Sequence, residues 1–330
     1  MARSIVIQVS TTTNFLDPRT AKNASVLVMV AALLSFGFAS IPATGETAGD
    51  DGTVLSLLSY NIHGISGLIA KDDPRDRMPT IGWLTHTYDV VLVQEDFEYH
   101  GELAQQFANT ANRYRGNGIG SRPDLILAKI VSFPFLVFIP RFSPPYGAGL
   151  SIFVDKEHSV PESSISEAYS DCYGWIKYSA DCWSAKGYQR VTVHTGDGTE
   201  VDIYNTHLEA GGSTGDFAAR RLQLGQLADA IERLSDGRAV IVAGDFNTAM
   251  IRPADRTMVR EFRDRLGLRD SGAAPELPIW RERDLILFRN GGGTVIEVEA
   301  AGEALEFTGH GTALSDHAAL YARFRLRTSH

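Results

Sequence analysis

Short apolar runs recur along the chain, and most of them end in polar side chains that can take part in chemistry. The runs have strand-like lengths, and between two of them residues 216–234 place apolar side chains at helical spacing. These strands and this helix are compatible with an α/β fold. The predicted strands lie within residues 53–64, 88–97, 147–154, 189–195, 201–212, 239–250, 281–289 and 317–326.

The stretch AVIVAGDFNTAM, residues 239–250, shows the pattern most clearly. An apolar run leads through a glycine to Asp245 and Asn247. Side chains two residues apart in an extended chain point to the same side. A buried strand has no use for a charge at its tip, so this carboxylate and amide are placed to hold a ligand at the carboxyl end of a sheet.

Polar residues also lie beside the apolar residues of the other predicted strands. An isolated aspartate at a strand end is more often a turn former or a helix cap, and an isolated histidine is usually structural. Because these residues recur beside successive apolar runs, turns alone do not account for them, and they predict one shared site. The candidates are Asn61, Glu95, His207, Asp245, Asn247, Asp284, Asp316 and His317.

The charge balance disfavours non-specific binding to nucleic acid. The chain of 330 residues has a formal net charge of −9, and without residues 1–45 it keeps 28 basic and 39 acidic residues, or −11. An acidic body repels a phosphate backbone, and the sequence has no basic stripe with interleaved aromatic residues. A local basic groove or a bound metal would offset this charge, so a nuclease stays as an alternative.

The N-terminal segment has the features of a secretory signal peptide. An uncharged apolar run spans residues 26–38, Arg19 and Lys22 precede it, and small residues follow it. We expect cleavage after Ala39 or after Gly45. The apolar run is short for a membrane span, which needs about 20 residues, and an uncleaved membrane anchor is the alternative.

The cysteine content agrees with export. The chain has two cysteines, Cys172 and Cys182, and a pair so close in sequence predicts a disulfide in an oxidising compartment. Two buried free thiols are the alternative. We therefore expect residues 1–45 to be the signal peptide with its preceding segment, and the mature protein to be a secreted or periplasmic monomer.

Taken in order, the motifs of this chain resemble those of the endonuclease/exonuclease/phosphatase superfamily over about residues 53–327. They are SYNIHG, VLVQE, YNTHLEAG, VAGDFN, RDLI and LSDHAAL. The run DCWSAKG, followed by NTHLEAGG and DFAARRLQ, is similar to the sphingomyelinase-like branch. The resemblance implies a DNase I-like fold, a four-layer α/β sandwich of two mixed β-sheets flanked by helices, and it implies that residues 50–330 form a single catalytic domain.

The resemblance also implies hydrolysis of a phosphoester with the help of a divalent cation. Such a reaction needs a cation to neutralise the phosphoryl oxygens, an oriented water that loses its proton, and a stabilised leaving oxygen. Oxygen ligands suit Mg²⁺, with Mn²⁺ or another divalent cation as the alternative. We expect Glu95 to be the principal metal ligand, with Asn61 beside it and Asp316 as a further contact.

Five residues are expected to carry the catalytic roles. Asp245 aligns or deprotonates the attacking water, and Asn247 holds a phosphate oxygen. His317 contacts the phosphate and is oriented by Asp284, a pairing that raises the basicity of the imidazole. His207 stabilises the transition state or protonates the leaving group. The sequence leaves open which histidine acts as base and which as acid.

The first motif departs from the superfamily pattern. His63 stands where some members have an aspartate, which puts one optional metal contact in doubt. We expect His63, His194 and His310 to have no catalytic role. Lys186 is either a lysine beside the site or a solvated one.

The leading interpretation is an exported, Mg²⁺-dependent phosphodiesterase that hydrolyses a phospholipid such as sphingomyelin. The alternatives are a secreted nuclease, a soluble inositol-phosphate or phosphomonoester phosphatase, and a non-enzymatic binding protein that keeps the fold. Residues 125–142 are unusually apolar and contain four phenylalanines. We expect them to form either a buried strand with its connection or a loop that makes peripheral contact with a bilayer.

Overall fold

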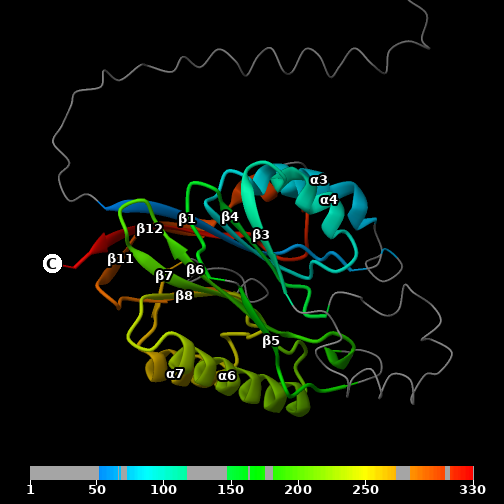
Figure 1. The fold of residues 1–330 in the computed structure, drawn as a ribbon. Coiled ribbons are helices and arrows are strands. Elements are labelled where there is room, and N and C mark those ends of the chain that lie inside the picture. Colours follow the sequence, from blue (N-terminus) through cyan, green and yellow to red (C-terminus); the bar gives the residue numbers. More distant parts are fainter. Residues whose placement is uncertain are drawn as a thin grey trace, which may run out of the picture. The chain divides into compact units, whose positions relative to one another are not determined.

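The computed structural model describes residues 52–65, 67, 73–116, 147–162, 164–174, 181–272, 283–308 and 313–329 (Figure 1). The predicted signal segment 1–45 and the apolar stretch 125–142 lie outside these residues. The described strands and helices belong to one unit, Asp50–His330. Within the described part of the chain, every helix is too short or too polar to cross a membrane.

Two six-stranded mixed sheets form the centre of this unit. The first sheet has the order β11 (Thr294–Glu303), β12 (Leu320–Thr328), β1 (Thr53–Asn61), β2 (Val90–Gln94), β4 (Ser151–Asp155) and β3 (Ala111–Arg115). The second has the order β5 (Ile165–Ala168), β6 (Gly187–His194), β7 (Glu200–His207), β8 (Val240–Asp245), β10 (Asp284–Arg289) and β9 (Arg269–Asp270). Each sheet holds one parallel pair, β1 with β2 and β7 with β8.

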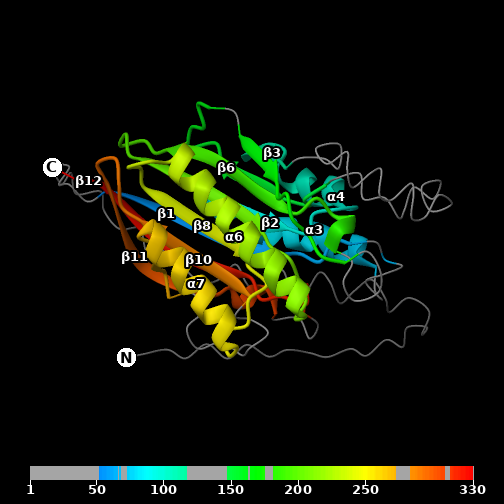
Figure 2. The ribbon, with the colours of Figure 1, turned by 90° about the horizontal axis from the view of Figure 1, so that it is seen from below.

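Helices cover the outer face of each sheet (Figures 1 and 2). One apolar cluster fills the space between the sheets, and two further clusters join each sheet to its helices. The predicted four-layer α/β sandwich is therefore confirmed. The first sheet carries α3 (Pro74–Thr85) and α4 (His100–Ala104), and the second carries α6 (Thr214–Leu234) and α7 (Pro253–Leu266).

Strand β1 shows why its sequence is apolar over most of its length. Leu55 and Leu57 enter the cluster between the sheets, whereas Leu58 and Tyr60 enter the cluster beneath the helices. A strand that is buried on both faces has no solvated side for polar residues. Such a strand exposes functional side chains only at its ends.

Local signals fix where the two long helices begin and end. Ser213 and Asp216 form a reciprocal capping box at the start of α6, which satisfies two free backbone N–H groups. Pro253 opens α7, where its fixed φ suits the first turn. Gly267 closes α7 with a φ of 65°, a conformation that favours glycine.

A buried pair of amides joins the two sheets directly beneath their carboxyl ends. Gln94 donates through Nε2 to Oδ1 of Asn205 at 2.7 Å. The amide nitrogen of Asn205 donates to the carbonyl oxygens of Val93 and Ser151 at 2.9 and 3.1 Å. Buried polar groups of this kind are stabilising only when all partners are present. The pair therefore fixes the end of β2 relative to β7.

Replacing Asn205 with leucine is expected to lower the free energy of unfolding by about 3 kcal/mol, because the partners of Asn205 then stay buried without hydrogen bonds. Urea denaturation measures the change. Asn112→Leu is the matched control, since Asn112 is half-buried on the edge strand β3, and we expect a change within about 0.5 kcal/mol there. Equal stabilities of the two variants would contradict a structural role for the amide pair.

Candidate active site

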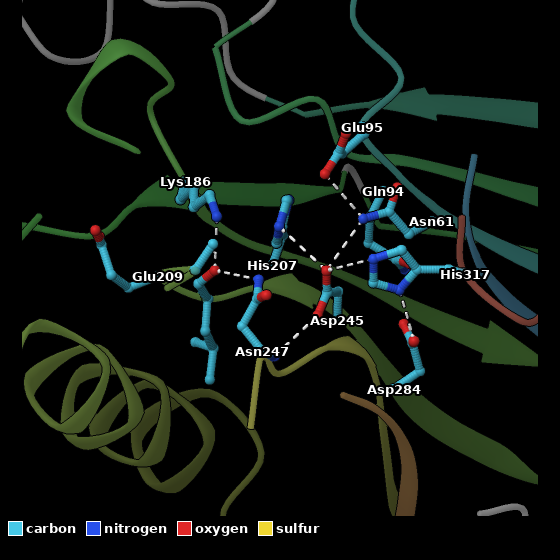
Figure 3. A network of polar contacts seen from close by, with 12 residues as sticks. Asn61, Gln94, Glu95, Lys186, His207, Glu209, Asp245, Asn247, Asp284 and His317 are labelled. Atoms are coloured by element: carbon cyan, nitrogen blue, oxygen red, sulfur yellow. Dashed lines mark hydrogen bonds and ion pairs between the residues drawn. The ribbon is translucent and has the colours of Figure 1, made fainter. Parts of the chain in front are cut away.

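The candidate residues meet because strand ends from both sheets meet. In the first sheet Asn61 is aligned with Gln94 at the ends of the parallel strands β1 and β2. In the second, Asp245 is aligned with His207 on one side and with Asp284 on the other. Residues separated by more than a hundred positions therefore lie at one shared edge (Figure 3).

Asp245 is the centre of the polar network (Figure 3). Its Oδ2 accepts a hydrogen bond from Nδ2 of Asn61 at 3.0 Å and lies 3.4 Å from Nε2 of His207 and 3.7 Å from Nε2 of His317. Its Oδ1 accepts from the backbone N–H of Asn247 at 2.8 Å. Burial raises the pKa of the Asp245 carboxyl, but the charge of His317, together with that of His207 when this ring is protonated at low pH, outweighs burial and lowers it. The carboxylate is therefore ionised at neutral pH.

His317 is held as a cation by two carboxylates. Its Nδ1 lies 2.8 Å from Oδ2 of Asp284, which is also buried. Burial alone lowers the pKa of His317, but the charges of Asp284 and Asp245 outweigh burial and raise the pKa to about 10. The pair places a positive Nε2–H donor beside Asp245.

His207 has the opposite electrostatic character, although it too contacts Asp245. Burial, together with the nearby charge of Lys186, lowers its pKa to about 4. Its Nδ1 is buried and has no hydrogen-bond partner among the described residues. One site thus holds a neutral imidazole and an imidazolium on either side of a single carboxylate.

The raised pKa of His317 links folding to pH. The ordinary pKa of 6.5 applies to the unfolded chain, so the stabilisation from the protonated ring is complete below pH 6.5 and is lost as pH rises towards 10. We expect the unfolding free energy of the metal-free wild type to fall between pH 6.5 and 9.5. His317→Gln should flatten this fall, and urea denaturation across the range measures it. Parallel profiles would show that His317 is not protonated in the fold.

Glu95 lies on the side of the site that the first sheet forms. Its Oε1 accepts a hydrogen bond from Nδ2 of Asn61 at 3.0 Å, so Asn61 connects Glu95 to Asp245. Burial raises the pKa of the Glu95 carboxyl, but a hydrogen bond from His63, the charge of His207 when this ring is protonated at low pH, and the hydrogen bond from Asn61 lower it below its ordinary value. Glu95 therefore presents a full negative charge at the cleft.

His63, which the sequence reasoning set aside, lies between two carboxylates. Its Nδ1 is 3.4 Å from Oε2 of Glu95 and 3.3 Å from Oδ1 of Asp316. Asp316 has a side chain that is 58% exposed and contacts Ser315 in addition to His63. The only signal in the sequence was the histidine of SYNIHG itself, at a position where some superfamily members have a carboxylate.

Residues with strained backbone conformations cluster at the candidate site. Among the described residues, three that are not glycine have a positive φ: His63 at 49°, Glu95 at 57° and Asn247 at 50°. A left-handed conformation costs roughly 1–3 kcal/mol at such residues and persists where the surrounding structure holds it, most often at functional sites. Three strained residues in one cluster mark this edge independently of charge or sequence motif.

A second polar cluster lies beside His207, on the side away from Asp245 (Figure 3). Lys186 is buried, with its Nζ 2.6 Å from Oδ1 of Asp181 and 2.8 Å from the carbonyl oxygen of Leu208. The alternative of a solvated lysine is therefore wrong. Glu209 is also buried, and burial together with the charge of Asp181 raises its pKa to about 8. Glu209 was not among the predicted site residues, although it belongs to the motif YNTHLEAG, because nothing in the motif shows that its carboxyl group is buried beside Asp181.

The predicted disulfide between Cys172 and Cys182 is present. It joins the loop before the second cluster to the short 3₁₀ helix η4 (Asp181–Trp183). Asp181 therefore sits next to a covalent anchor. Its Oδ2 accepts from the backbone N–H of Ala210, which fixes the loop after His207.

The donor set is compatible with a divalent cation. Two groups of potential ligand atoms each lie within 4.8 Å of one another: Glu95 with His207 and Asp245, and Asp245 with Asp284 and His317. Ionised carboxylates are hard oxygen donors, which suit Mg²⁺ or Mn²⁺. The oxygen of Asn61 accepts from the backbone N–H of His63. Asp316 belongs to neither group.

Comparisons with known proteins agree with this architecture. The chain is 28% identical over 293 residues to sphingomyelinases of Mycobacterium tuberculosis and Mycobacterium bovis, a match that covers 83% of this chain and 52% of the relatives. The chain thus spans about half the length of the curated relatives it matches.

Solved structures share the fold at low sequence identity. Sphingomyelinase C from Streptomyces griseocarneus aligns with a TM-score of 0.56 and 18% identity, over 82% of this chain and 99% of that one. A beta toxin from Staphylococcus aureus with bound magnesium ions aligns with a TM-score of 0.57 and 16% identity, over 84% of this chain and 100% of that one. The sequence profile of the Endonuclease/Exonuclease/phosphatase family matches residues 58–317. The chain therefore belongs to the Endonuclease/Exonuclease/phosphatase family.

Proposed function

We propose that this protein is an exported, metal-dependent phosphodiesterase that hydrolyses a phospholipid such as sphingomyelin. The observation that carries the proposal is the pair of histidines within 3.4 and 3.7 Å of Asp245, held in opposite charge states. This arrangement can bind a phosphate anion through one ring and exchange a proton through the other. The sphingomyelinases that the chain resembles support a lipid substrate.

Glu95 would hold the cation, because it is ionised and stands at the first sheet's end of the site. When bound, a divalent cation neutralises phosphoryl oxygens and favours attack by water. Asn61 keeps its amide between Glu95 and Asp245 and so fixes their spacing. Two carboxylates held side by side repel one another, and the amide donor offsets that repulsion.

The other residues act on the water and the phosphate. Asp245 orients the attacking water as a hydrogen-bond acceptor, since its lowered pKa keeps it ionised. His317 donates from its positive Nε2–H to a phosphate oxygen, and Asp284 fixes the ring orientation from the other nitrogen. Asn247, whose amide nitrogen also donates to the carbonyl oxygen of Leu208, binds a second phosphate oxygen. His207 is neutral at pH 7 and stabilises the leaving oxygen.

Export is supported by the signal-like N-terminal sequence and by the disulfide between Cys172 and Cys182. An activity panel tests the whole proposal. It includes sphingomyelin, phosphatidylcholine, inositol phosphates, p-nitrophenyl phosphate esters and supercoiled DNA, each with Mg²⁺ and with a chelator. We expect Mg²⁺-dependent hydrolysis of a phospholipid. Rapid nicking of DNA with inert lipids would identify a nuclease instead, and no activity on any phosphoester would favour a binding protein.

A further inference from the structure

A cavity of about 290 Å³ opens directly beside the candidate active site. Asn247 lines it and also contacts the loop that follows His207. Arg283, the residue before Asp284 in the sequence, lines it as well. A group bound in the cavity would therefore be a neighbour of a phosphate held by Asn247 and His317. The cavity itself has no part in the reaction proposed for the site residues.

Among the described residues that line the cavity, the two charged ones are arginines, Arg252 and Arg283. Arg252 has a side chain that is 51% exposed, and its nearest carboxylate oxygen, on Asp255, is 3.6 Å away. Asp255 is buried and lies at the same distance from the fully buried Arg220, so it is shared between two cations. Arg283 is exposed and makes no ion pair with any residue that the structure describes. The cavity therefore has an excess of positive charge.

A further carboxylate beside the cavity, that of Asp216, is already engaged. Asp216 is buried and accepts from the backbone N–H of Ser213 in the capping box of α6. Gly212 provides room for the guanidinium, because a Cβ there would lie 3.0 Å from one terminal nitrogen of Arg252. An arginine presents several N–H donors in a rigid fork that matches the oxygens of phosphate or carboxylate. The chemistry of the walls selects an anion.

We propose that this cavity binds a second anionic group, a phosphate or a carboxylate, carried by the same substrate molecule as the scissile phosphate. This inference rests on the proposed function. Among phospholipids, it predicts a preference for those whose head group carries an acidic group in addition to the phosphodiester that is cleaved. Choline, the cationic group of sphingomyelin, offers no acceptor to either arginine, so we expect lipids with an anionic head group to be cleaved faster than sphingomyelin.

A matched pair of lipids tests the proposal. Phosphatidylinositol 4-phosphate differs from phosphatidylinositol by one phosphate, and both are presented to the full chain with Mg²⁺ in micelles of an uncharged detergent. We expect the wild type to show a kcat/KM about tenfold higher for the phosphorylated lipid. Arg252→Gln and Arg283→Gln should each reduce this ratio, and the double variant should bring it close to 1. A ratio unchanged in the double variant would overturn the inference.

Arg260→Gln is the matched control, because Arg260 is exposed on α7, outside the cavity lining, and its loss changes the net charge equally. We expect this variant to keep the wild-type ratio of the two kcat/KM values.

A binding measurement separates the inference from the proposed function. Calorimetry with inositol 1,4-bisphosphate and inositol 1-phosphate should show tighter binding of the bisphosphate by the wild type but not by the double variant. If the bisphosphate bound more tightly but no lipid were hydrolysed, the proposed phosphodiesterase activity would be rejected and the anion site would stand. Equal affinities of the wild type for the two inositol phosphates would reject the anion site.

Discussion

Replacing Asp245 with asparagine is expected to reduce turnover at saturating Mg²⁺ by about a thousandfold or more. Asparagine keeps the shape of the side chain but removes the negative charge that lies 3.4 Å from His207 and 3.7 Å from His317. It also presents an amide N–H₂ to the donors that now converge on Oδ2. The attacking water then loses its acceptor, and His317 loses one of the two charges that keep it protonated.

Steady-state kinetics on the substrate identified by the activity panel measures this effect. Asp236→Asn is the control, because Asp236 is exposed in the turn after α6, and we expect wild-type turnover there. Turnover of Asp245→Asn within tenfold of the wild type would rule out Asp245 as the centre of the site.

The double variant of Asp245→Asn with His317→Gln adds a sharper test. If both residues act on one transition state, their effects are strongly non-additive, and the double variant is little slower than the worse single variant. Losses that multiply would mean that the two residues act in separate steps. Circular dichroism of each variant shows whether the fold is retained.

Replacing Glu95 with glutamine is expected to weaken binding of Mg²⁺ or Mn²⁺ by at least about a hundredfold, and to abolish metal-stimulated activity. Changes in groups that only support metal ligands already cost 10–100-fold in affinity, and Glu95 is the carboxylate that we expect to contact the ion itself. Calorimetric titration with Mn²⁺ measures binding without relying on turnover.

Glu102→Gln is the control for this experiment. Glu102 lies near the start of α4 and pairs with Arg75, so its loss removes one surface charge outside the candidate site. Metal affinity should be unchanged there. If Glu95→Gln bound Mn²⁺ as tightly as the wild type, the cation would have to be held by other carboxylates, such as those of Asp245 and Asp284.

Much of the fold was predictable because its strands are buried on two faces. Strand β8 is apolar up to Gly244 and Asp245, so the sequence itself shows where burial ends and chemistry can begin. The helix at residues 216–234 was equally clear, and the structure starts it at Thr214, where the capping box of Ser213 lies. The position of a cap depends on a few hydrogen bonds, which an apolar period does not reveal.

The candidate residues were also recognisable, because each lies beside an apolar run within an ordered set of motifs. The residues that contact them were harder to recognise. His63 was expected to have no catalytic role, yet it lies between Glu95 and Asp316. Lys186 had two interpretations of equal standing until its burial beside Asp181 decided between them. The side chains that surround these residues come from distant segments, and no local pattern encodes such contacts.

The sequence by itself determined which polar side chains are available, the order along the chain of the strands that carry them, and the strand ends beside which these side chains lie. Only the tertiary structure decided their states. His207 and His317 are both histidines at strand ends beside Asp245, but Lys186 and burial keep one neutral while Asp284 keeps the other charged. The reason is that a pKa depends on burial and on charges within a few ångströms, and those distances exist only after the two sheets have packed together.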